Sequence, residues 1–211
     1  MICVNDKKDK ISKKMVIDAN MNAHKELQHY LNNKNQTNDM LISIKNLFHL
    51  NQIPHKVATF DNSHRNGQFA IGAMVFYENG EFVKTKYRKV NFEDTNDDYK
   101  MMYESVKKRI ISFNKDIDSI DLLIIDGGIG HANIVKSLMN EVNIYIDFLC
   151  ITKGENRNDR SDYFISQNGE VINLRNDAQE YKFIEKMRNE AHRFSNYCSE
   201  LLYLNQINNK I

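Results

Sequence analysis

The spacing of apolar residues along the chain changes near residue 55. Before it, two stretches with helical spacing, 22-NAHKELQHYL-31 and 40-MLISIKNLFHL-50, predict helices separated by a polar linker at 32–39. After it, short apolar runs bounded by polar residues predict strands. We therefore expect three parts, namely a helical arm at 1–54, one compact domain at 55–204 and a tail at 205–211.

The domain begins with strands that we expect to form an antiparallel meander. The first is 56-KVATFD-61, and two more lie in 69-FAIGAMVFYENGEFVKTKYRKV-90 on either side of Asn79-Gly80. That dipeptide is typical of a tight hairpin turn. The meander should therefore contain three strands.

A helix and further strands follow. Thr95 and Asp98 fit a capping box, and the apolar stripe behind them comprises Tyr99, Met102, Val106 and Ile110. The later elements are expected as a strand at 121–126, a helix at 132–141, a strand at 144–151, a hairpin around Asn168-Gly169 and a helix at 177–204. Apolar strands flanking a helix indicate a parallel βαβ unit. The order predicts an α/β fold of the ribonuclease H-like type, a mixed sheet with three antiparallel strands, then parallel ones, and helices on both faces.

Composition and charge are those of a globular protein. The 211 residues suffice for one substantial core, and no apolar run approaches the roughly 20 residues that span a bilayer. Cys3, Cys150 and Cys198 form no metal-binding or disulfide pattern, and no secretory signal is visible, so we expect a cytoplasmic location. The net charge of +1 gives no overall attraction to nucleic acid, so any polyanion site must be a local patch.

Two acids end apolar strands and are candidates for chemistry. Asp61 precedes the turn Asn62-Ser63, and Asp126 precedes a glycine-rich turn. If the two strands are parallel neighbours, both carboxylates emerge at one edge of the sheet, where they repel unless a cation neutralises them. Oxygen ligands of this kind suit Mg²⁺ or Mn²⁺ and metal-assisted phosphodiester hydrolysis. The alternative is a pair of ordinary solvated acids.

The glycines after Asp126 allow a second interpretation. The stretch 128-GIGHAN-133 is a partial dinucleotide fingerprint, with Asp147 about 20 residues further on. Asp147 lies inside an apolar run, however, and an acid directly before the glycines is badly placed beside a pyrophosphate. We therefore favour a turn that presents the carboxylate.

His192 is the third candidate. It shares a face of the last predicted helix with Arg188 and Asn189 and could bind a metal or transfer a proton; the alternative is a surface histidine. His64, beside Asp61, is a candidate for a supporting role.

Six motifs in order resemble one family. They are TFDNSH (59–64), KTKYRKV (84–90), DDYKMM (97–102), LLIIDGGIGHAN (122–133), ITKG (151–154) and KMRNEAHRF (186–194). Together they are similar to the C-terminal endonuclease domain of the UvrC subunit of bacterial excinuclease. The resemblance implies a ribonuclease H-like domain that cuts damaged double-stranded DNA on the 5′ side of a lesion, with a UvrB-type helicase subunit as partner.

The resemblance also implies a site. Asp61, Asp126 and His192 correspond to an Asp-Asp-His set that binds Mg²⁺ or Mn²⁺, and Asp98 is implicated in catalysis beside its expected part in capping a helix. Two positions depart from the family: Asn189 stands where an acid is usual, and Ile129 where a lysine is usual.

Basic residues provide candidates for DNA binding. Lys84, Lys86 and Arg88 alternate on a predicted strand and should project from one face, although a merely solvated face is the alternative. Arg65, Lys153 and Arg193 lie beside the candidate catalytic positions and could hold phosphate oxygens.

Two other functions stay open. One is an endonuclease V-like nuclease of the same fold, and the other is a degenerate relative that binds DNA or a partner without cutting. The family's usual flanking modules do not appear in this sequence, so we expect weak DNA binding by the chain alone.

Overall fold

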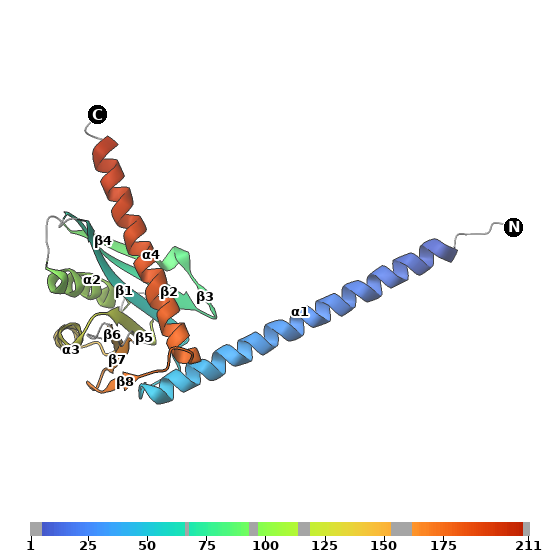
Figure 1. Cartoon of the computed structure of the whole chain (residues 1–211), viewed down its shortest axis with the longest axis horizontal. Coiled ribbons are helices and arrows are strands. Elements are labelled where there is room, and N and C mark those ends of the chain that lie inside the picture. The colour runs from blue at the N-terminus through green and yellow to red at the C-terminus, as the bar shows by residue number, and fades with distance from the viewer. Residues whose placement is uncertain (1–5, 66–67, 93–96, 114–118, 153–161, 209–211) are drawn as a thin grey trace. The chain divides into compact units, whose positions relative to one another are not determined.

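Figure 1 shows the computed structural model, which describes residues 6–65, 68–92, 97–113, 119–152 and 162–208. The elements of these residues are, in order, α1 (Asp6–Leu47), β1 (Lys56–Arg65), β2 (Gln68–Glu78), β3 (Glu81–Phe82), the 3-10 helix η1 (Lys84–Lys86), β4 (Arg88–Phe92), α2 (Asp98–Phe113), β5 (Leu122–Asp126), α3 (Ile129–Val142), β6 (Asp147–Thr152), β7 (Tyr163–Ser166), β8 (Val171–Asn173) and α4 (Gln179–Asn208).

The strands form one mixed sheet in the order β3-β2-β1-β5-β6-β7-β8, with β4 also paired to β2. β1 and β2 are antiparallel, whereas β1, β5 and β6 run parallel to one another. The hairpin turns fall where they were predicted, since Asn79, Gly80 and Gly169 have positive φ angles. The predicted mixed sheet is thereby confirmed.

Helices cover both faces of the sheet, and β5 shows why its sequence is continuously apolar. Leu123 and Ile125 pack in a core with α2 and α3, whereas Leu122 and Ile124 pack in a second core with α4 and the end of α1. Successive residues of a strand face opposite sides, so a strand buried on both faces has no polar positions. The polar residue that ends it, Asp126, is half-buried.

The chain divides into two compact units, Met1–Asp39 and Met40–Ile211. The predicted linker at 32–39 is wrong, because those residues are helical and belong to α1. No glycine or proline occurs between residues 6 and 47, so nothing in this polar stretch interrupts helical hydrogen bonding. In the part of the chain that the structure describes, no helix is both long enough and apolar enough to cross a membrane.

Two local expectations also differ from the structure. The strand predicted to carry alternating basic residues is interrupted by η1, so Lys84 and Lys86 lie in a 3-10 turn and only Arg88 begins a strand. The amide of Lys100 donates a hydrogen bond to Oδ1 of Asp97 over 3.0 Å, so Asp97 caps α2. Thr95 and the side chain of Asp98 lie outside the described residues.

Candidate active site

Asp61 and Asp126 lie side by side on neighbouring parallel strands. The register of β1 and β5 pairs Phe60 with Ile125, and each acid is the next residue of its strand. Ile124 packs in the core under α4, so Asp126, two residues later, points to the same side of the sheet. The predicted meeting of the two acids at one edge is therefore observed.

Asp61 is 5% exposed and is held by α4. The hydroxyl of Ser195 donates a hydrogen bond to Oδ2 of Asp61, and Nδ1 of His192 lies 3.5 Å from the same oxygen. Burial, with repulsion from Asp126, raises the pKa of Asp61 above its usual 3.8, while Ser195 and His192 oppose that rise. The carboxylate thus lies in a position where its charge is costly unless a cation is near.

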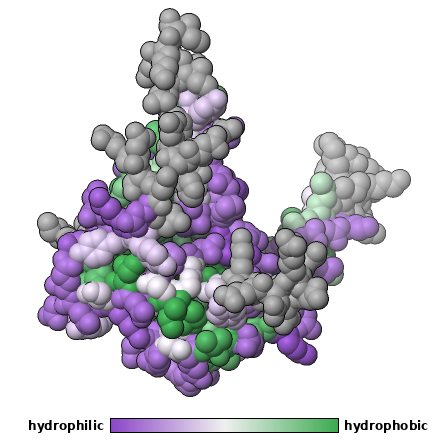
Figure 2. Space-filling model, turned by 60° about the vertical axis from the view of Figure 1, so that its left-hand side comes forward, coloured by the Kyte–Doolittle hydropathy of each residue, from purple (hydrophilic) through white to green (hydrophobic). Residues whose placement is uncertain are grey.

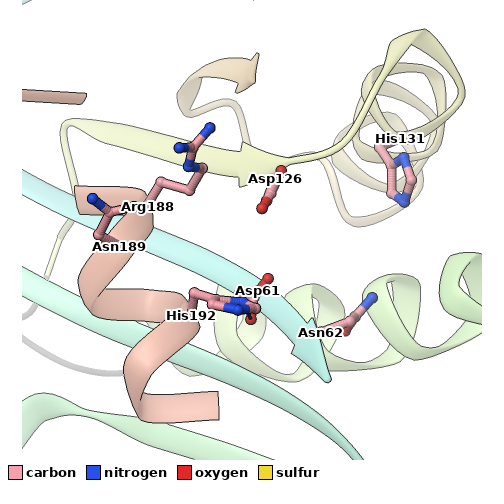
Figure 3. Close-up of a pocket in the computed structure, with 7 residues that line it drawn as sticks. All are labelled: Asp61, Asn62, Asp126, His131, Arg188, Asn189 and His192. Atoms are coloured by element: carbon pink, nitrogen blue, oxygen red, sulfur yellow. Dashed lines mark ion pairs between the residues drawn. The ribbon is translucent and has the colours of Figure 1, made fainter. Parts of the chain in front are cut away.

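A cavity of about 360 Å³ opens over the two acids. Figure 3 shows His192 on α4 pointing toward Asp61, with Asp126 at the end of the adjacent strand. The residues that line the cavity are Asp61, Asn62, Asp126, His131, Arg188, Asn189 and His192. The structure therefore brings together all three predicted catalytic residues whose side chains it describes.

Arg188 contributes a cation to the same cavity. Its Nη1 donates to Oδ2 of Asp162, and the two side chains are only 15% and 12% exposed. The hydroxyl of Tyr181 donates to the same Asp162 oxygen over 3.4 Å. A guanidinium fixed in this way can hold a phosphate oxygen without first losing much side-chain freedom.

The glycines of the turn after Asp126 make room for rings. A Cβ atom at Gly127 would lie 2.5 Å from Cγ and Nδ1 of His131, and one at Gly130 would lie 2.7 Å from the hydroxyl oxygen of Tyr99. Both distances are shorter than van der Waals contact allows. A side chain at either glycine would therefore force the facing ring to shift.

The dinucleotide interpretation does not fit the sheet. Asp147 pairs in register with Leu122 at the start of β5, so it lies at the edge opposite Asp126. It is 6% exposed and accepts a hydrogen bond from the amide of Asn51 over 2.6 Å. Its role is to anchor a loop.

The donor set suits a hard divalent cation. Asp61 and Asp126 offer carboxylate oxygens, His192 offers an imidazole that is 62% exposed, and water and substrate phosphate would complete the coordination of Mg²⁺ or Mn²⁺. No three His, Cys, Asp or Glu side chains among the described residues are close enough to form a metal site by themselves. The fit thus rests on the two carboxylates, whose mutual repulsion a cation would relieve.

Most basic candidates have acidic or carbonyl partners. Arg193 binds Glu190 through Nε and Nη2, each at 2.7 Å, and Nζ of Lys86 lies 2.9 Å from Glu78. Nη1 of Arg88 donates to two backbone carbonyls, and Lys84 is exposed. The side chain of Arg65 and all of Lys153 lie outside the described residues, as does the side chain of His64. The expected common face of Lys84, Lys86 and Arg88 is wrong, because η1 replaces the strand.

Sequence reasoning did not single out Ser195, Arg188 or His131 as members of the candidate site. Ser195 follows His192 by three residues on a helix, so helical spacing was a signal that could have found it. Arg188 had been noted only as a neighbour of His192. His131 carried no signal beyond its place after the glycines.

Antiparallel strands leading into parallel ones, helices on both faces and two neighbouring carboxylates on adjacent parallel strands define a nuclease-type domain of ribonuclease H-like fold. The family model described as the UvrC RNase H endonuclease domain matches residues 45–195. The chain belongs to that family.

Named relatives agree with this assignment. The chain is 35% identical over 176 residues to UvrABC system protein C of Wolbachia sp. subsp. Brugia malayi. The aligned region covers 82% of this chain and 29% of the relative. The chain is 33% identical over 198 residues to the protein of the same name from Rickettsia prowazekii, covering 86% and 32%. The chain thus spans about a third of these relatives' length.

Solved structures show more distant likeness. The catalytic domain of human endonuclease V aligns with a TM-score of 0.40 at 12% identity, covering 56% of this chain and 61% of that one. Argonaute of A. aeolicus aligns with a TM-score of 0.38 at 16% identity, covering 58% and 20%.

Proposed function

We propose that this chain hydrolyses the DNA phosphodiester backbone with Asp61, Asp126 and His192 as its catalytic residues. The observation that carries the proposal is the pairing of β1 with β5, which sets the two carboxylates beside each other under α4. In the family to which the chain belongs, this domain is an endonuclease.

Each side chain has a role in the proposed reaction. Asp61 and Asp126 hold Mg²⁺ or Mn²⁺, which when bound supplies the Lewis acidity that activates a water and stabilises the leaving oxygen. His192, beside Asp61, accepts or returns a proton. Arg188 holds a phosphate oxygen, because its guanidinium is fixed by Asp162 at the cavity wall. Asp98 remains a candidate.

The relatives support a proposal about the wider activity. We propose that the chain makes the cut on the 5′ side of a lesion in nucleotide excision repair, together with a UvrB-type helicase subunit. The proposed location is the cytoplasm, where thiols stay reduced, which suits the buried free thiols of Cys150 and Cys198.

DNA contacts belong to the same proposal. Arg65, Lys153 and Arg193 are proposed beside the cavity, with Lys84, Lys86 and Arg88 further along the chain. Arg193 and Lys86 would have to exchange Glu190 and Glu78 for phosphates, so we expect these two to add less affinity than an unpaired cation.

The test is nicking of a supercoiled plasmid and of a lesion-bearing duplex in Mn²⁺. We compare the wild type with Asp126→Asn and, as a matched control, Asp177→Asn. Asp177 is an exposed acid paired with Arg175 outside the cavity. We expect nicking by the wild type and the control and at least a hundredfold less by Asp126→Asn.

Equal nicking by all three proteins would contradict the proposed site. Calorimetric titration with Mn²⁺ gives a second readout, because the wild type and the control should bind the ion and Asp126→Asn should not. Absence of both nicking and ion binding in the wild type would favour the non-catalytic alternative, which Asn189 at the cavity wall supports.

A further inference from the structure

We propose that Tyr99 and His131 form a stacking shelf for a nucleobase next to the phosphodiester that occupies the cavity. The ligand class rests on the proposed function, whereas the shelf itself is a feature of described side chains. Neither residue belongs to the Asp-Asp-His set. The shelf would add a binding subsite that does not depend on charge.

The two rings already lie against each other. Their centroids are 4.7 Å apart with an angle of 39° between the planes, and they come from different helices, α2 and α3. His131 lines the cavity over the two acids, while Tyr99 is 50% exposed. An exposed aromatic ring supported from behind by a second ring offers a flat surface for stacking.

Two glycines leave room for the rings. Gly127 and Gly130 lack the Cβ atoms that would collide with His131 and Tyr99, so both rings approach the turn that follows Asp126. His131 and the proposed catalytic carboxylate of Asp126 therefore lie on the same six-residue stretch, and Tyr99 of α2 packs against it. A base on the shelf would belong to a nucleotide whose backbone passes close to Asp126.

The surroundings favour a base over another phosphate. Asp61 and Asp126 repel phosphate unless a cation is bound, and Ile129, at the start of α3, is 60% exposed and carries no charge. Hydrophilic residues predominate on the face drawn in Figure 2, where most of the hydrophobic ones gather in its lower half. A π-face is common to every base, so stacking here would hold DNA without selecting its sequence.

The experiment compares binding with and without bases. The probes are two strands of about 12 nucleotides, one an oligodeoxyadenylate and the other the same sugar-phosphate chain without bases. Binding is measured by fluorescence anisotropy at low salt in the full chain carrying Asp126→Asn, which prevents cutting. Tyr99→Ala, Tyr99→Phe and Tyr145→Ala are each added to that background. Tyr145 is the matched control, since it is 71% exposed and lines a different cavity, to which neither Asp61 nor Asp126 contributes.

We expect the parent to bind the intact strand roughly tenfold more tightly than the base-free strand. Tyr99→Ala should remove most of that ratio, while Tyr99→Phe and Tyr145→Ala should keep it. If Tyr99→Ala kept the same ratio of affinities, or if the parent bound the two strands equally, the proposed shelf would be overturned. Plasmid nicking by the wild type separates the two proposals. Tighter binding of the intact strand without nicking would contradict only the proposed nuclease activity. Nicking without tighter binding of the intact strand would contradict only the proposed shelf.

Discussion

Ser195 and Asp61 lie 134 residues apart in the sequence, and Ser195 Oγ donates a hydrogen bond to Oδ2 of Asp61. This contact joins the last helix to the first strand at the point where catalysis is proposed. It also stabilises the ionised carboxylate, which burial and Asp126 disfavour. The hydroxyl is therefore expected to influence the pH range in which Asp61 could hold the proposed cation.

Ser195→Ala is expected to move the pH dependence of ion binding. Loss of the hydrogen bond raises the pKa of Asp61 further, so the carboxylate ionises at higher pH and the midpoint of Mn²⁺ binding moves up. Calorimetric titrations between about pH 5 and pH 8 measure that midpoint. Ser199→Ala, another buried serine of α4, serves as the control. An unchanged midpoint in Ser195→Ala would refute the role of the hydroxyl.

Asp126→Asn is expected to stabilise the metal-free chain at neutral pH. Because the pKa of Asp61 is raised by folding, its contribution to stability is full below the usual 3.8 and is lost as the pH rises through the raised value. Removing the charge at Asp126 lowers the folded pKa of Asp61 and reduces that loss. We expect a gain on the order of 1 kcal/mol, or about 2–4 °C in Tm.

Thermal melts in a chelator test this gain. The difference between Asp126→Asn and the wild type should be present at pH 7 and should shrink toward zero as the pH falls below 3.8. Mn²⁺ should raise the Tm of the wild type alone. If the stability of Asp126→Asn relative to the wild type were lower at pH 7 than at low pH, repulsion between Asp61 and Asp126 would be unimportant.

Gly127→Ala is expected to displace His131. The added Cβ would meet the imidazole at 2.5 Å, so either the ring or the turn must move, at a cost of about 1–3 kcal/mol. In a His131→Ala background the same change should cost much less, because the obstacle is gone. Gly128→Ala is the control, since the nearest atom there is 3.6 Å away. Urea denaturation of the four variants measures the coupling, and strictly additive costs would argue against the steric explanation.

Asp162→Asn is expected to destabilise the chain by about 3 kcal/mol. It leaves the guanidinium of Arg188, 15% exposed, without its ionic partner. Asp177→Asn, at an ion pair whose side chains are 86% and 73% exposed, should cost less than about 0.5 kcal/mol. Denaturant unfolding of both variants gives the comparison, and equal costs would mean that burial does not strengthen the Arg188–Asp162 pair.

Much of the fold could be predicted from the sequence, because its strands are short apolar runs with clear ends. Asp126 could be placed for the same reason, since it ends its strand, whereas β1 continues four residues beyond the predicted end at Asp61. The two acids still meet, because Asp61 directly follows Phe60, which pairs with Ile125. The long helix α1 was missed in part, because polar composition at 32–39 suggested a loop although no residue there breaks a helix.

Contacts between distant side chains could not be predicted. The hydrogen bond from Ser195 to Asp61 depends on how α4 docks on the sheet, which no local pattern specifies. Likewise, Lys86 resembled a strand residue by alternation, but it lies in a 3-10 turn where its ammonium contacts Glu78 and lies 4.7 Å from the centre of the Phe76 ring. An alternating pattern of only three basic residues is too short to distinguish a strand from a turn.

The position of α4 in the chain has a consequence for the timing of activity. α4 is synthesised after every strand of the sheet, and it carries His192 and Ser195. Its core residues, such as Ile184 and Met187, must dock before these two side chains reach Asp61. A growing polypeptide on the ribosome can therefore contain both acids while lacking the histidine, so the proposed cutting of DNA would require that α4 has been made and has docked.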